Sequence, residues 1–75
     1  MKAFDESKTH DVFIVDDESR EIVGVAGKAI PANRLERRIE TAGNRINWMR
    51  FTISVAEAGQ FKKGDVLPMD KEVEV

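Results

Sequence analysis

Residues 46–55 read INWMRFTISV, and this stretch decides the fold class. Large apolar side chains occupy every second position, at Met49, Phe51, Ile53 and Val55. A period of two is the spacing of a β-strand that has one buried face and one solvent face. Trp48 falls among the solvent-facing positions, where its ring either covers the sheet edge or anchors a contact with a partner.

Two more strands are predicted upstream of this stretch. Residues 11–15 (DVFIV) and 21–26 (EIVGVA) are rich in β-branched and aromatic side chains, which favour strands. The polar residues 16–19 between them are typical of a turn, because short polar side chains bond their own backbone. We therefore expect a β-hairpin.

The downstream residues predict a turn and two short strands. In residues 62–65 (KKGD), Gly64 tolerates a positive φ and Asp65 accepts backbone N–H bonds within the turn. Val66 and Leu67 begin a strand, and residues 72–75 (EVEV) alternate as a last one. The order predicts a mainly β fold, a small antiparallel β-barrel or sandwich of about five short strands.

The length of 75 residues accommodates one domain. We expect residues 1–10 to form a flexible N-terminal tail with His10 at the surface, and residues 11–75 to form a single β-rich domain. The chain has no cysteine, so disulfides do not stabilise it. A domain of this size without such links often gains stability by assembling with copies of itself or with a partner.

An arginine-rich segment lies between the second and third predicted strands. Residues 32–42 contain no proline and no internal glycine, and Leu35 and Ile39 share one side at helical spacing. This pattern fits a short helix. It fits equally well a long basic loop that becomes ordered on binding.

Charge is distributed unevenly along the chain, whose formal net charge is −2. Residues 1–27 carry three basic and seven acidic groups, residues 28–50 carry six basic and two acidic, and residues 51–75 carry three basic and five acidic. This acidic–basic–acidic order favours head-to-tail contact between like subunits. The negative total argues against nucleic acid as the main partner.

The sequence contains no motif for catalysis, cofactor binding or metal binding. Gly24 to Lys28 lacks the glycine spacing of a phosphate loop, and the acidic residues 16–18 lack the spacing of a calcium loop. We therefore expect a protein that is not an enzyme and needs no cofactor. No apolar run approaches the ~20 residues of a membrane span, and the N-terminus has no signal-peptide core, so we expect a cytoplasmic location.

Residues 51–67 (FTISVAEAGQFKKGDVL) resemble the signature of phage head–tail joining proteins of the lambda FII type. The shared pattern is an apolar strand, a turn with a glutamate, two basic residues, Gly-Asp and a second apolar strand. Residues 22–25 (IVGV) are similar to the family's preceding strand, and a long variable loop, here 26–44, separates the two. The resemblance covers roughly residues 20–75.

This resemblance implies a structural role in a virion. The protein would be a connector subunit that forms a homo-oligomeric ring and contacts the portal-associated protein and the tail proteins. In that family, flexible segments become ordered on assembly. The matching segment here predicts a set of assembly contacts, which we expect to include Trp48 as well: Arg34, Leu35, Arg37, Arg38, Ile39 and Trp48.

The alternative interpretation is a small DNA-binding regulator of the swapped-hairpin antitoxin type. Residues 28–31 (KAIP) followed by the arginines, and then residues 63–66 (KGDV), are similar to parts of that fold. A local basic face would bind phosphates despite the negative total charge. Salt-dependent binding to duplex DNA distinguishes this alternative from the connector.

Overall fold

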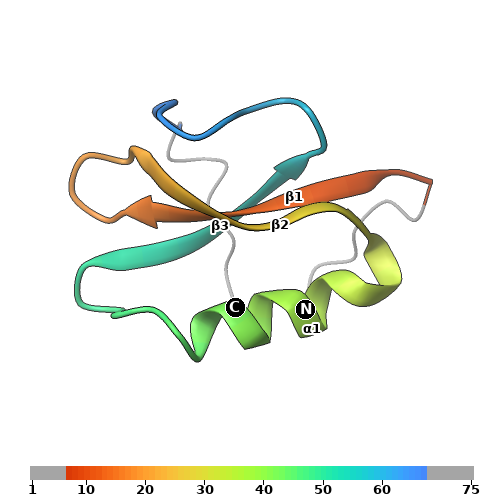
Figure 1. Cartoon of the computed structure of the whole chain (residues 1–75), viewed down its shortest axis with the longest axis horizontal. Helices are drawn as coiled ribbons and strands as arrows, with labels where there is room; N and C mark the ends of the chain where they lie inside the picture. The colour runs from red at the N-terminus through yellow and green to blue at the C-terminus, as the bar shows by residue number, and fades with distance from the viewer. Residues whose placement is uncertain (1–6, 68–75) are drawn as a thin grey trace.

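The computed structural model describes residues 7–67 and contains three strands and one helix. The strands are β1 (Thr9–Asp16), β2 (Ile22–Pro31) and β3 (Phe51–Glu57), and the helix is α1 (Ala32–Gly43). The sheet order is β2-β1-β3, and both neighbours of β1 run antiparallel to it. Figure 1 shows α1 on one side of the sheet and the segment that follows β3 on the other.

The two edges of the sheet differ in regularity. β3 pairs with β1 without interruption, from His10 opposite Glu57 to Asp16 opposite Phe51. β2 pairs with β1 through three register shifts, so its backbone bulges. One of these shifts lies at residues 28–29, where two residues of β2 stand opposite the single residue Asp11 of β1.

The helix covers one face of the sheet. Leu35, Ile39 and Ala42 follow the spacing of one helical stripe and are all buried. They pack against Val12 of β1 and against Ile53 and Val55 of β3, which are also buried. The segment between the second and third strands is therefore a helix and not a loop. Its narrow apolar stripe is stabilised because it packs against the sheet.

Residues 58–67 cover the opposite face. Leu67 and Phe61 pack there against a second apolar cluster, formed by Phe13, Val15, Ile22 and Ala56. The segment is fastened to the start of β2: the N–H of Ile22 donates to the carbonyl of Asp65 at 2.8 Å, and the N–H of Gly64 donates to the carbonyl of Ile22 at 2.9 Å. Each face of the sheet thus carries a buried apolar cluster, although Val23 and Val25 of β2 remain exposed.

The expectation of a mainly β, antiparallel chain is confirmed in this coarse form, and of the two alternatives left open between strands 2 and 3 the structure has the helix. The sheet is open, however, and residues 7–67 contain three strands, not the closed barrel of about five. Val66 forms an isolated bridge with Glu21 and not a strand. Residues 58–67 instead pack across a face of the sheet through Phe61 and Leu67. The strand expected at residues 72–75 lies outside the described residues.

Two expectations about the third strand are wrong. The strand begins at Phe51, and Met49 lies in the preceding turn with 90% of its surface exposed. Ser54, expected to face solvent, is completely buried, because residues 58–67 cover that side. Likewise β1 begins at Thr9, so His10 lies buried in a strand and not at the surface of a tail.

Candidate functional site

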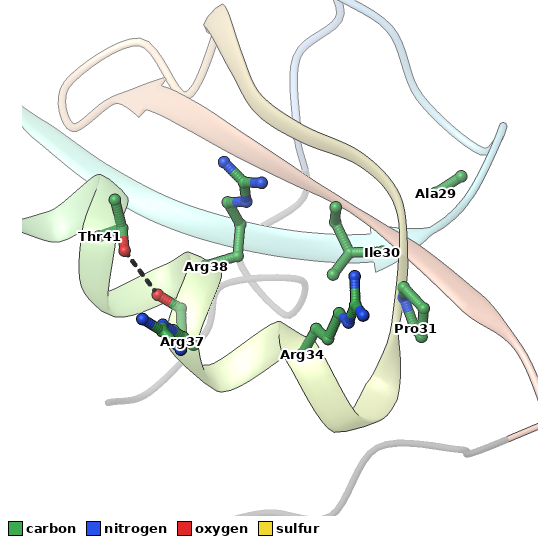
Figure 2. Close-up of a pocket in the computed structure, with 7 residues that line it drawn as sticks. All are labelled: Ala29, Ile30, Pro31, Arg34, Arg37, Arg38 and Thr41. Carbon is green, nitrogen blue, oxygen red and sulfur yellow. Dashed lines mark hydrogen bonds between the residues drawn. The ribbon is translucent and has the colours of Figure 1, made fainter.

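A shallow groove lies between the end of β2 and helix α1. Its volume is about 620 Å³, and Figure 2 shows Arg34 and Arg38 extending from the helix toward β2. The lining consists of Ala29, Ile30, Pro31, Arg34, Arg37, Arg38 and Thr41. The groove therefore combines guanidinium groups with a small apolar wall.

The helix begins directly at the end of the strand, which fixes the shape of the groove. Pro31 is the N-cap of α1 with φ −63° and ψ 150°, so the chain passes from extended to helical geometry without a loop. The arginines and Thr41 recur at steps of three and four residues and so lie along neighbouring rows of the helix. Leu35 and Ile39 pack in the core, so the side of the helix that carries the arginines faces away from it.

Arg38 crosses β2 at a glycine. A Cβ atom at Gly27 would lie 3.0 Å from Cγ of Arg38 and 3.1 Å from Cγ1 of Ile30. Contacts this close are strongly disfavoured, so the absence of a side chain at residue 27 makes room for the aliphatic part of Arg38. Gly27 therefore helps to position one of the three guanidinium groups.

A buried carboxylate shapes the wall at Ala29. Oδ1 of Asp11 accepts the backbone N–H of Ala29 at 2.8 Å, and Oδ2 accepts that of Gly59 at 3.1 Å. Asp11 is only 3% exposed, and Ala29 has a φ of 52°, a left-handed conformation that is unusual for alanine. Asp11 thus ties the bulge of β2 to the turn after β3.

The three groove arginines have no carboxylate partner in the described part of the chain. The ion pair found there joins Lys8 and Glu57 at 3.4 Å, and neither residue lines the groove. Glu36 and Glu40 are on the same helix, yet neither forms an ion pair with these arginines. Three like charges along one groove repel each other, so an anionic group placed among them would be attracted, more so at low salt because all three arginines are exposed.

The predicted contact residues separate into three places. Arg34, Arg37 and Arg38 come together in the groove, whereas Leu35 and Ile39 are 0% and 5% exposed and belong to the core. Trp48 lies at the other end of α1, where its Nε1 donates to the carbonyl of Gly43 at 2.8 Å and the ring remains half exposed.

The turn at residues 62–65 is remote from the groove lining. Gly64 has a φ of 98°, and Oδ2 of Asp65 accepts the N–H of Lys62 at 3.0 Å. These residues hold the segment that covers the sheet, so their role in the structure is to shape a turn.

Within residues 7–67, acidic and histidine side chains form no cluster of three that could hold a metal ion. That same part of the chain contains no helix long and apolar enough to cross a membrane.

Sequence reasoning missed several residues that shape the groove. Thr41 follows Arg37 and Arg38 at helical spacing, so a helix over this segment predicts that it lies on the same side as the arginines. Its hydroxyl donates to the carbonyl of Arg37 at 3.0 Å. The contribution of Asp11 has no local signal, because its partners Ala29 and Gly59 are distant in sequence.

Comparisons of this chain with protein-family models, with curated proteins and with solved structures give no match.

Proposed function

We propose that this protein is a non-enzymatic assembly subunit that binds an acidic segment of a protein in its arginine groove. The observation that carries the proposal is that three arginines line one groove and have no carboxylate partner within residues 7–67. Guanidinium groups pair with carboxylates through two parallel hydrogen bonds, which gives both attraction and orientation.

A protein partner fits this groove better than a long polyanion. Ile30 and Pro31 form an apolar wall beside the arginines, and apolar contact is what a folded protein segment offers in addition to charge. The formal net charge of −2 would repel a nucleic acid at longer range.

Within this class, the resemblance of residues 51–67 to head–tail joining proteins supports a connector subunit of a phage or prophage. The partners would be copies of the same chain in a ring, together with portal-associated and tail proteins. A ring needs a contact between two different surfaces of identical subunits, because such head-to-tail contacts close by rotation. A positively charged groove is suited to be one of the two surfaces in such a contact, with an acidic surface of the neighbouring subunit as the other.

Sedimentation velocity over a concentration series tests the proposal. We expect the wild-type protein to form a concentration-dependent, ring-sized species and the double variant Arg34→Glu/Arg37→Glu to remain monomeric. Arg38 is left in place because its aliphatic part packs over Gly27. The matched control is Lys62→Glu/Lys63→Glu, which makes the same charge change at two exposed residues outside the groove lining and should assemble normally.

Two results would contradict the proposal. One is a wild-type protein that stays monomeric from micromolar to millimolar concentration and also binds no other acidic protein. The other is normal assembly of the groove variant.

Duplex DNA is the second candidate ligand, since the same guanidinium groups suit phosphates. Fluorescence anisotropy with labelled duplex over a salt series tests this alternative. If the three groove arginines each contact a phosphate, the logarithm of affinity falls with the logarithm of salt with a slope of about −3. Binding of that kind, abolished by Arg34→Glu/Arg37→Glu, would favour the DNA-binding regulator over the connector.

A further inference from the structure

We infer that the segment bound in the arginine groove is the acidic β1–β2 turn, residues 16–21, of a second copy of this chain. This inference rests on the proposed function and names the partner of the same groove. The turn holds four acidic residues, of which Asp17, Glu18 and Glu21 are exposed. It is the natural complement of a groove whose charged side chains are all arginines.

The acidic turn is ordered before it meets a partner. Oδ1 of Asp16 accepts the backbone N–H groups of Glu18 and Ser19, both at 2.9 Å, and the N–H of Arg20 donates to the carbonyl of Asp16 at 2.9 Å. The side chain of Arg20 is 9% exposed and so leaves the tip of the turn to Asp17 and Glu18. An ordered turn loses little entropy on binding, which favours affinity.

The turn and the groove of one molecule cannot meet each other. The turn precedes Ile22 at one end of β2 (Figure 1), and the groove extends along β2 from Pro31 at the other end back to Gly27, where Arg38 packs. At about 3.3 Å per residue, the five residues from Ile22 to Gly27 still separate the turn from the near end of the groove by roughly 16 Å. Their contact must therefore join two copies through unlike surfaces, and repetition of that contact produces a ring or a filament.

The two surfaces also match in their apolar parts. Met49 is 90% exposed next to the acidic turn, since the N–H of Asp17 donates to the carbonyl of Arg50 at 2.9 Å. The groove places Ile30 and Pro31 next to its arginines. One surface thus presents carboxylates beside an exposed thioether, and the other presents guanidinium groups beside an apolar wall. Such double complementarity fixes the orientation of docking.

A charge exchange between the two surfaces tests the inference. The groove variant is Arg34→Glu/Arg37→Glu, the turn variant is Asp17→Lys/Glu18→Lys, and the exchanged variant carries all four changes. We expect each double variant to weaken self-association at least about tenfold. The exchanged variant should recover it, because opposite charges again face each other. An equimolar mixture of the two double variants should also associate.

Additional measurements and variants distinguish a lost contact between subunits from a failure to fold. Circular dichroism and thermal unfolding of every variant show whether it folds. The neutral pairs Arg34→Gln/Arg37→Gln and Asp17→Asn/Glu18→Gln replace any variant that does not fold and should weaken association in the same direction. Met49→Ser should weaken association as well, but leave its dependence on salt unchanged because no charge is removed.

The possible results distinguish this inference from the proposed function. If the groove variant loses association and the turn variant keeps it, the turn is not the bound segment, and another acidic partner occupies the groove. Loss in both double variants without recovery in the exchanged variant also overturns the turn–groove contact. If the wild type does not associate with itself, or if neither double variant matters, self-assembly through this groove is wrong altogether.

Discussion

Oδ1 of Asp11 accepts the backbone N–H of Ala29 at 2.8 Å, and this hydrogen bond holds one wall of the arginine groove in a left-handed conformation. The same carboxylate reaches the N–H of Gly59 with its other oxygen. One buried side chain thus connects β2, β1 and the turn after β3. The shape of the exposed groove depends on an interaction within the protein.

Replacement of Asp11 by asparagine should lower the free energy of unfolding by about 1–3 kcal/mol. An amide has one acceptor oxygen, so the backbone N–H of Ala29 or of Gly59 loses its partner in a partly buried place. Urea denaturation measures the change. Glu57→Gln is the control, because it removes only the exposed pair with Lys8 and should change stability by less than about 0.5 kcal/mol. Equal effects of the two substitutions would contradict the role of Asp11.

Ala29→Gly should raise the free energy of unfolding by about 0.5–1 kcal/mol. The left-handed φ of 52° costs about 1–2 kcal/mol for a residue with a Cβ atom, and glycine removes this cost while adding some entropy to the unfolded chain. The control is Ala58→Gly, at a residue without a positive φ, which should lower stability by a similar amount. Opposite signs in the two urea titrations are the expected result, and equal signs would refute the strain at Ala29.

Trp48 and Gly43 should show an energetic coupling. Trp48→Phe removes the indole N–H that donates to the carbonyl of Gly43 and should cost about 0.5–1.5 kcal/mol. Gly43→Ala should also destabilise the protein, since its Cβ would lie 3.0 Å from Cζ2 of Trp48, although alanine favours helices. In the Trp48→Phe background that ring atom is absent, so Gly43→Ala should become stabilising. Additive effects in the double-mutant cycle would contradict the contact.

The carboxylate of Asp16 should contribute to stability only while it is charged. The backbone N–H groups of Ser19 and Glu18 hold the pKa of Asp16 below its ordinary value. A lowered folded pKa means that the contribution is complete above the unfolded pKa and is lost as the pH falls through the folded pKa. The stability difference between wild type and Asp16→Asn, which keeps the turn without the charge, should shrink from neutral pH to about pH 2. A difference that stays constant over this range would contradict the interaction.

The sequence contained enough information for the hairpin, for the third strand and for the grouping of the arginines. Val12, Phe13 and Val15 favour a strand by themselves, and the arginines share a side once residues 32–43 are helical. It did not contain enough to decide between helix and loop, because Leu35, Ile39 and Ala42 form a stripe that is stable only against a sheet.

Burial of the second face was harder to predict for a physical reason. Ser54 and Ala56 are small and carry little hydrophobic signal, yet they are buried because residues 58–67 fold back over this face of the sheet. Val66 and Leu67 read as a strand because of their composition, but tertiary contacts use Leu67 to fill the apolar cluster at Phe13. Neither outcome depends on local propensity.

The return of residues 58–67 across the sheet has a consequence for biosynthesis. Phe13 and Val15 are translated before Leu67, which belongs to the same cluster but lies more than fifty residues further along the chain. Contacts of such long sequence separation form late and slowly. The nascent chain therefore completes this half of its interior only after Leu67 has left the ribosomal exit tunnel.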